Sequence, residues 1–322
     1  MGQLHILLWS YNNLKGDCPM KLEFDDQDSL LIWLYLEISA LFSQTELLLY
    51  TMRFSPNHVP FFTDAELFTC VPKFREELIK SQDKKSGYEY IKKHYGQWFP
   101  ALPCYEVYNR KLNKFHEAFA YIYQSIRSKY GHANQPVAMI DTAPIEVCQP
   151  QHSNKSNAAQ PFVSKGYCAA KKKYYVGAKL QIVAQARAHK LPLPIEFALA
   201  SASIHDLEIA KETLPDSELK NMDLFGDNAY IDKSFQLELF ETKNMKLITG
   251  IKKRKGQTNL MLFQQATNTI HSSIRQPIDA LFAWIQKKTG IQNASKVRSQ
   301  NGLFYQVCVK MVAALIMLIA KF

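Results

Sequence analysis

Three aspartates occupy positions from which they could hold divalent metal ions. Asp141 ends the apolar run 137–142, and Asp227 ends the run 222–227. Both runs are typical of short β-strands, and open sheets bind ligands beyond the C-terminal ends of their strands. Asp279 lies where a long helical pattern opens. Carboxylate oxygens suit Mg²⁺, so acids from two strand ends and one helix predict metal-dependent phosphodiester chemistry.

Each acid also has an ordinary structural explanation. A strand such as 137–142 commonly ends in a turn residue such as Asp141. Asp227 could cap the helix that follows Gly226. Asp279 lies four residues after Arg275, so an i,i+4 ion pair would explain both residues. Arg275 would then either pair with Asp279 or contact a phosphate.

The bulk composition indicates a folded, basic protein. The chain has 322 residues, of which 47% are hydrophobic and 21% charged, which excludes a largely disordered protein. Its net charge of +10 points to an acidic partner, most often nucleic acid. The six cysteines form no CxxC pair, which argues against a zinc site and is typical of reduced thiols in the cytoplasm. The apolar run 311–320 is half the length of a membrane span, so we expect a buried core helix there.

The first 130 residues are expected to be helical. The apolar spacing predicts helices over about 25–52, 63–80, 88–94 and 105–130. Several of these carry basic residues, so region 1–130 could bind DNA or help to assemble a complex, or its charges could simply be solvated.

At about residue 135 the pattern changes to strands alternating with helices. Strands are expected over 137–142, 174–185, 193–200, 222–227 and 245–251, and helices over 204–212, 233–243 and from 270 onward. Residues 143–170 are expected to form a long connection with a polar middle. The fold class is therefore α/β (α+β), a mixed sheet flanked by helices over 135–322 after an all-helical N-terminal region.

Basic residues near aromatic ones are candidates for contacting a DNA backbone. These basic residues could instead lie in loops and contact only solvent. His205 and Asp206 could orient a ligand near the acids or cap the helix that begins there. The candidate DNA-binding residues are Lys171, Lys172, Lys173, Lys179, Lys252, Lys253, Arg254, Lys255 and Arg275.

The element order and five stretches of sequence resemble the ribonuclease-H-like core of DDE transposases from bacterial insertion sequences. The likeness covers roughly residues 60–320, and residues 98–112 also resemble the family's N-terminal region. The five stretches are Ile140-Asp141-Thr142-Ala143-Pro144-Ile145, Tyr174-Tyr175-Val176-Gly177-Ala178-Lys179-Leu180, Ser203-Ile204-His205-Asp206, Leu224-Phe225-Gly226-Asp227-Asn228-Ala229-Tyr230-Ile231 and Arg275-Gln276-Pro277-Ile278-Asp279.

The resemblance implies a catalytic triad of Asp141, Asp227 and Asp279 that holds two Mg²⁺ ions, with Mn²⁺ as a substitute. Asp141 would bridge the ions, and the other two acids would each hold one. The family normally has Glu at the third position. Asp279 is shorter by one methylene, roughly 1.5 Å of reach, which would weaken metal binding or activity unless the helix lies closer.

The implied activity is cleavage and transfer of DNA strands at the ends of a transposable element. The resemblance further implies a multimer assembled on DNA, without a membrane, in the bacterial cytoplasm and associated with the nucleoid. Two alternatives remain open: a DNA-binding remnant of a transposase that has lost catalysis, and a ribonuclease-H-like nuclease that acts on RNA or repair intermediates.

Overall fold

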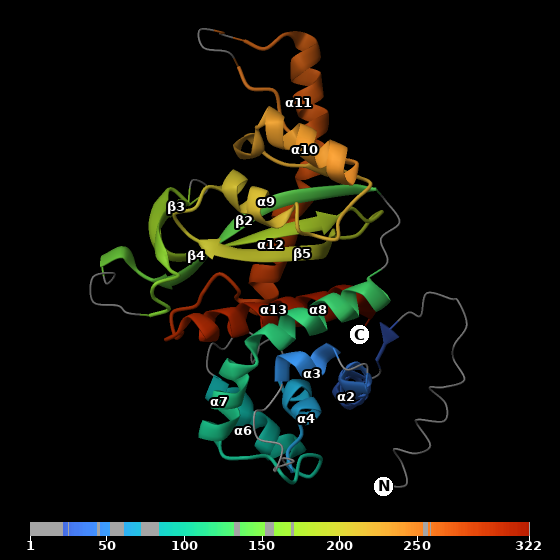
Figure 1. Ribbon diagram of the computed structural model, residues 1–322, viewed down its shortest axis with the longest axis vertical. Coiled ribbons are helices and arrows are strands. Elements are labelled where there is room, and N and C mark those ends of the chain that lie inside the picture. Colours follow the sequence, from blue (N-terminus) through green and yellow to red (C-terminus); the bar gives the residue numbers. More distant parts are fainter. Residues whose placement is uncertain are drawn as a thin grey trace.

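A six-stranded mixed sheet forms the centre of the molecule. The computed structural model describes residues 22–24, 26–43, 46–51, 61–71, 84–131, 136–151, 158–168, 171–253, 257 and 259–321. The strands of the sheet are β2 (Val137–Cys148), β3 (Ser164–Cys168), β4 (Lys173–Gln185), β5 (Leu193–Ser201), β6 (Met222–Phe225) and β7 (Met245–Ile248). Their order is β3-β4-β2-β6-β7, and β5 also pairs with β4 (Figure 1).

Strand direction divides this sheet into two parts. β4 is antiparallel to β2, β3 and β5, whereas β6 is parallel to both β2 and β7. The helices α9 (Asp206–Thr213), α10 (Lys233–Lys243), α11 (Leu262–Arg275), α12 (Pro277–Thr289) and α13 (Gln300–Ile319) accompany it, with the short 3₁₀ helix η2 (Asn228–Tyr230) after β6. A curled mixed sheet flanked by helices is consistent with a ribonuclease-H-like fold, and the predicted fold class is confirmed.

The N-terminal region is helical, as predicted. Its helices are α2 (Gln27–Ser43), α3 (Glu46–Thr51), α4 (Asp64–Thr69), α6 (Lys84–Tyr95), α7 (Tyr105–Lys114) and α8 (His116–Tyr130). Thr63 and Glu66 form a capping box that starts α4. The predicted helix over 105–130 is two helices, because the backbone leaves the helical conformation at Phe115. The end of the predicted helix 63–80 lies outside the described residues.

Helix α13 joins this helical region to the sheet. It is long and apolar enough to cross a membrane, but 67% of its apolar window is buried inside the protein. It packs along α8, where the rings of Phe119 and Tyr305 lie 5.4 Å apart, and it also contacts β5. In Figure 1, α13 and α8 lie together between the sheet and the other N-terminal helices. The expectation of a buried core helix is therefore confirmed.

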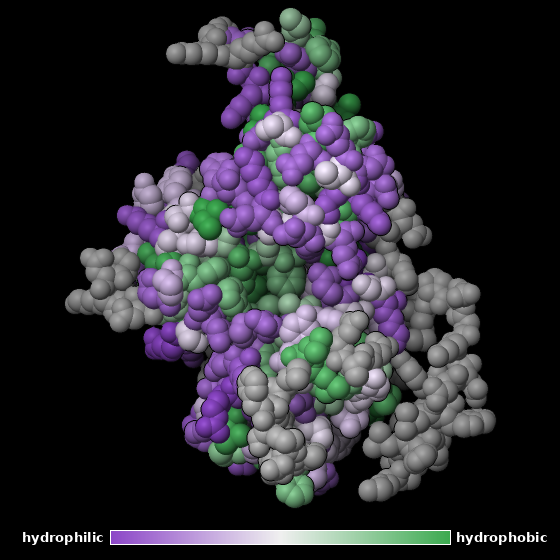
Figure 2. Space-filling model, viewed as in Figure 1, coloured by the Kyte–Doolittle hydropathy of each residue, from purple (hydrophilic) through white to green (hydrophobic). Residues whose placement is uncertain are grey.

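The two faces of the sheet have different cores. Met139, Ala143 and Ile145 of β2 belong to the core shared with α8, α12 and α13, whereas Ala138 and Ile140 face α9 and α10. Because successive side chains of a strand point to opposite faces, the Asp141 side chain lies on the same face as those of Met139, Ala143 and Ile145. On the outside, polar residues dominate the face in view, and apolar ones gather in a hollow at the level of the sheet (Figure 2).

Several elements differ from the predictions. Strand β2 continues to Cys148, so Asp141 lies within it and not at its end. Strand β3 occupies part of the predicted connection 143–170. Helix α11 begins at Leu262, eight residues before the predicted start at residue 270. A short parallel bridge also joins β1 (Leu22–Glu23) to β8 (Ala320–Lys321).

Candidate active site

Asp141 and Asp227 lie at the same level of the sheet. The parallel strands β2 and β6 are in register through Met139 and Phe225, and each aspartate lies two residues beyond that pair. Asp141 is therefore not at the end of its own strand, as the sequence suggested, but at the point where its parallel neighbour ends. The chain turns there because Asp227 caps η2, where its carboxylate accepts a 2.8 Å hydrogen bond from the Ala229 amide.

Arg275 connects Asp141 to Asp279. It is the last residue of α11, and its Nη1 donates to Asp141 Oδ2 at 2.8 Å. Its Nη2 donates to Asp279 Oδ2 at 3.1 Å in the first turn of α12. The i,i+4 ion pair anticipated from the sequence therefore forms, and Asp141 joins it.

The pKa of Asp141 responds to its surroundings. Burial raises the pKa of Asp141 to about 6, against the lowering effect of the Thr142 amide and of Arg275. The negative charges of Asp227 and Asp279 raise this pKa further. Asp279 is the most open of the site's ionic groups, with 54% of its side chain exposed against 20% for Asp141.

The three carboxylates have the chemistry to bind a hard divalent cation, although the Arg275 guanidinium contacts two of them in this structure. Three carboxylates supply the oxygen ligands that Mg²⁺ prefers. Among the described residues, no group of three or more His, Cys, Asp and Glu side chains is close enough to hold a metal ion. Arg275 bridges two of the acids, so a metal ion would have to replace its guanidinium in neutralising them.

A cavity of about 190 Å³ opens beside Asp227. Its lining comes from the turn after β6, the loop after β7 and α11: Asp227, Asn228, Gly250, Asn268, His271, Ser272 and Arg275. Asn268 holds the backbone of Ile251 by hydrogen bonds of 2.8 and 3.1 Å. His271 is buried, with Nε2 3.2 Å from the Ile248 carbonyl oxygen.

The sequence analysis missed Asn268 and His271. With the helix starting at Leu262, Asn268, His271 and Arg275 follow i, i+3 and i+7 spacing, so they share the face of α11 that meets the sheet. The sequence would have shown this spacing if the helix had been predicted to begin at Leu262 and not at residue 270.

Lys179, a candidate DNA-binding residue, and Asp206, expected near the acids, bind each other. Lys179 Nζ contacts Asp206 Oδ1 and the Ile204 carbonyl oxygen, both at 2.8 Å. This pair ties β4 to the start of α9. His205 occupies the N-cap position of α9, but its side chain makes no capping hydrogen bond. The Lys179–Asp206 pair thus helps to hold α9 on the sheet.

The predicted basic clusters differ in what they contact. Lys171 and Lys173 lie 3.7 and 2.7 Å from Glu146, so both are partly neutralised. Lys172 is exposed at the turn before β4, with a φ of 48°. The second cluster is only partly described: Lys252 and Lys253 are exposed, whereas Arg254 and Lys255 lie outside the described residues.

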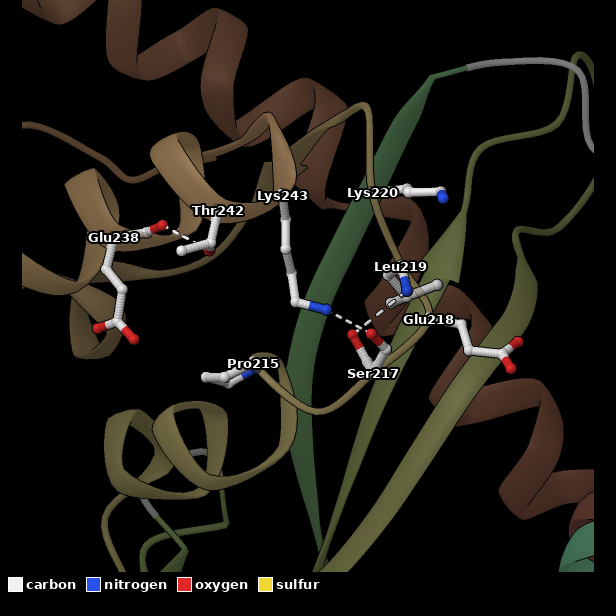
Figure 3. Close-up of a pocket in the computed structure, with 8 residues that line it drawn as sticks. All are labelled: Pro215, Ser217, Glu218, Leu219, Lys220, Glu238, Thr242 and Lys243. Atoms are coloured by element: carbon white, nitrogen blue, oxygen red, sulfur yellow. Dashed lines mark hydrogen bonds between the residues drawn. The ribbon is translucent and has the colours of Figure 1, made fainter.

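A larger cavity lies away from the acids. It measures about 740 Å³ and is lined by Pro215, Ser217, Glu218, Leu219, Lys220, Glu238, Thr242 and Lys243 (Figure 3). Lys243 crosses it to the Ser217 carbonyl oxygen. Because the loop that lines it leads into the first residue of β6, this cavity is at the opposite end of that strand from Asp227.

Comparison with known proteins identifies the family. The transposase DDE domain family matches residues 131–299, more than half of the chain, and this range contains all three aspartates. No curated protein matches the sequence. The chain therefore belongs to the transposase DDE domain family.

Proposed function

We propose that this transposase cuts and transfers DNA strands by metal-dependent chemistry at Asp141, Asp227 and Asp279. The observation that carries the proposal is the common level of Asp141 and Asp227 on two parallel strands, with Arg275 joining Asp141 to Asp279. Two strands and a helix that are far apart in the sequence contribute these carboxylates, which supports a shared site.

The three carboxylates would hold Mg²⁺, with Mn²⁺ as a substitute. Bound divalent ions supply Lewis acidity to the attacking and leaving oxygens of a phosphodiester. Asp141, half-buried within β2, would form one side of the site. Asp227 is fixed by its cap on η2, and Asp279 approaches from α12.

Arg275 provides positive charge beside the reacting phosphate. A guanidinium has five N–H donors, and the bonds to Asp141 and Asp279 leave others for a phosphate oxygen. Arg275 would thus orient the scissile phosphate once the acids are neutralised by metal.

The substrate would be the ends of a mobile element, such as a bacterial insertion sequence, together with target DNA. Hydrolysis would free a 3′-hydroxyl, which then attacks the target. The net charge of +10 suits binding to the DNA backbone, with the exposed Lys172, Lys252 and Lys253 as contributors. Region 1–130 would assist DNA binding or assembly, region 135–322 would carry the chemistry, and the chain would act as a multimer in the cytoplasm.

Nicking of DNA that carries the element's ends tests the proposal. Wild-type protein should nick in Mg²⁺ or Mn²⁺ and not in EDTA, and Asp227→Ala should lose at least 100-fold of that rate, by the order of magnitude of a lost catalytic group. Asp223→Ala, on the same strand, is a matched control and should nick normally. Activity that survives Asp227→Ala would exclude the triad.

A DNA-binding protein without catalysis is the second candidate. It is favoured by the absence of a ready-made metal cluster among the described side chains and by the exposed, short Asp279. Calorimetry with Mn²⁺ separates the two: metal binding that is lost in Asp141→Asn and Asp227→Asn supports the enzyme, and no binding by wild type supports the second candidate.

A further inference from the structure

An exposed pair of tyrosines lies at one edge of the sheet. Tyr167 of β3 and Tyr174 of β4 are registered partners, and their ring centroids are 5.0 Å apart. Even after this contact, 53% of Tyr167 and 58% of Tyr174 remain exposed. We call β3 and its partner residues, Ser164–Cys168 and Lys173–Gly177, the tyrosine ribbon; Figure 1 shows it at the left edge of the sheet.

Positive charge accompanies these rings. Lys165 Nζ lies 4.7 Å from the centroid of the Tyr174 ring. Lys171, Lys172 and Lys173, at the start of β4 and just before it, are all exposed, and Glu146 partly neutralises the first and the third. Exposed tyrosine rings can stack on an unpaired base, because every base has an aromatic face. The lysine beside them can attract the phosphate of the same nucleotide.

The ribbon shares a sheet face with the acids. Asp141 pairs with Ile182 of β4, and residues directly opposite each other point to the same face. Tyr174 and Ile182 are eight residues apart on β4, so alternation places Tyr174 on that face too. Tyr174 and Ile182 are about 26 Å apart along the strand at 3.3 Å per residue. Ala178 and Leu180, which lie between them on this face, are buried in the core, so a DNA strand would run around the edge of the sheet and not across this face.

We propose that Tyr167 and Tyr174 form a stacking site for unpaired DNA bases a short distance from the cleavage point. Lys165 holds the adjoining phosphate, and the ribbon thereby selects DNA whose strands are separated near the element's end. This inference rests on the proposed function for the identity of the nucleic acid, but it does not depend on catalysis.

Binding measurements in EDTA test the site without strand cleavage. The probes are a labelled duplex and the same duplex with a run of unpaired thymines, titrated with the full chain. The double variant Tyr167→Thr/Tyr174→Thr keeps a β-forming residue at each position and should lose roughly 10- to 100-fold in affinity for the unpaired probe. For the intact duplex its affinity should change by less than about twofold, because phosphate contacts remain.

The matched control is Tyr167→Phe/Tyr174→Phe, which keeps the rings and should bind both probes as wild type does. Equal binding of the unpaired probe by the Thr variant and wild type would overturn the proposal, as would a Phe variant as weak as the Thr variant. If the Thr variant does not fold, photocrosslinking of wild type to 5-iodouracil in the unpaired run decides: crosslinks at Tyr167 or Tyr174 support the site, and crosslinks only elsewhere refute it.

Loss of this stacking and loss of the proposed function are separate results. Metal-dependent nicking that is abolished by Asp227→Ala, combined with unchanged binding by the Thr variant, would refute only the stacking site. Stacking at the two tyrosines without any nicking would support the stacking site and refute the catalytic proposal.

Discussion

Arg275 donates a 2.8 Å hydrogen bond to Asp141, although 134 residues separate the two in the sequence. The bond places a positive charge against a largely buried carboxylate whose pKa is raised to about 6 by burial. The same guanidinium reaches Asp279 at 3.1 Å. Asp141 and Asp279 are thus held together by a side-chain cation that a divalent metal ion bound there would displace, and this relationship has consequences for stability.

Replacing Arg275 with Gln should destabilise the metal-free protein by about 1–3 kcal/mol, because Asp141 loses its charged hydrogen-bond donor. Mn²⁺ should then stabilise the variant more than it stabilises wild type, since no arginine competes for the acids. Urea unfolding in EDTA and in Mn²⁺ measures both effects. Lys211→Gln breaks an ion pair with Asp232 remote from the acids and serves as the control. An Arg275→Gln protein as stable as wild type in EDTA would contradict this account.

Lengthening the third acid should improve catalysis. Asp279→Glu adds one methylene, roughly 1.5 Å of reach toward the other carboxylates, and misplacement of about 1 Å can cost up to 100-fold in rate. We expect metal-dependent nicking to rise about tenfold or more. Asp279→Asn, which keeps the length and removes the charge, should lower it. A Glu variant no faster than the Asn variant would show that Asp279 is not a ligand.

The helical region and the sheet should not fold separately. α13 packs more extensively on α8 than on any other helix, and Tyr123 of α8 donates a 2.7 Å hydrogen bond to the Pro194 carbonyl oxygen at β5. A fragment of residues 131–322 would expose the apolar side of α13 to water. We expect it to lack a cooperative thermal transition, and co-expression with residues 1–130 to restore one. A fragment that melts cooperatively by itself would show that the predicted boundary near residue 135 separates independent domains.

The sequence predicted best the elements whose signals are local. Helix α10 has the predicted bounds, since Asp232 caps its start with hydrogen bonds to the amides of Ser234 and Phe235 and Asn244 ends it in the left-handed conformation. The helix signals of α10 lie in neighbouring residues. The common level of Asp141 and Asp227, in contrast, depends on the pairing of β2 with β6, and the expectation that Asp141 ends its strand was wrong.

What the sequence missed depends on contacts between distant segments. Strand β2 passes through Pro144, which usually argues against a central strand. Beyond Met139 and Phe225, however, β2 no longer pairs with β6, and its next partner on that edge is Asn293 at Glu146. At Pro144 this edge therefore has no strand partner in the described part of the chain and tolerates a residue without an N–H. Strand β3 is short and contains Gly166, where a Cβ would lie 2.8 Å from Ala202. The Arg275–Asp141 bond likewise requires the folded arrangement of α11 against β2.

Lys310 allows a test of electrostatics in the core between α13 and α12. Its side chain is buried, with 4% exposure, and its Nζ donates to the Gly290 carbonyl oxygen at 3.1 Å. Burial lowers its pKa from 10.5 to about 8, because the charged ammonium loses solvation. At pH 7 the folded protein therefore keeps an ammonium in the core at a cost in stability.

Lys310→Met should raise the free energy of unfolding at pH 7 by about 1–3 kcal/mol, less whatever the unbonded Gly290 carbonyl costs. In wild type, stability should rise between pH 8 and 10.5, because there the unfolded chain binds more protons at this residue than the folded chain does. The advantage of the variant should accordingly shrink over the same interval. Urea unfolding at pH 7, 8 and 10 on wild type and variant follows this difference. Lys246→Met, at an exposed position of β7, controls for the change of residue type and should show no such pH dependence. A constant difference between Lys310→Met and wild type across this range would mean that Lys310 stays charged in the folded protein, and that the Gly290 carbonyl, not a neutral amine, compensates for its burial.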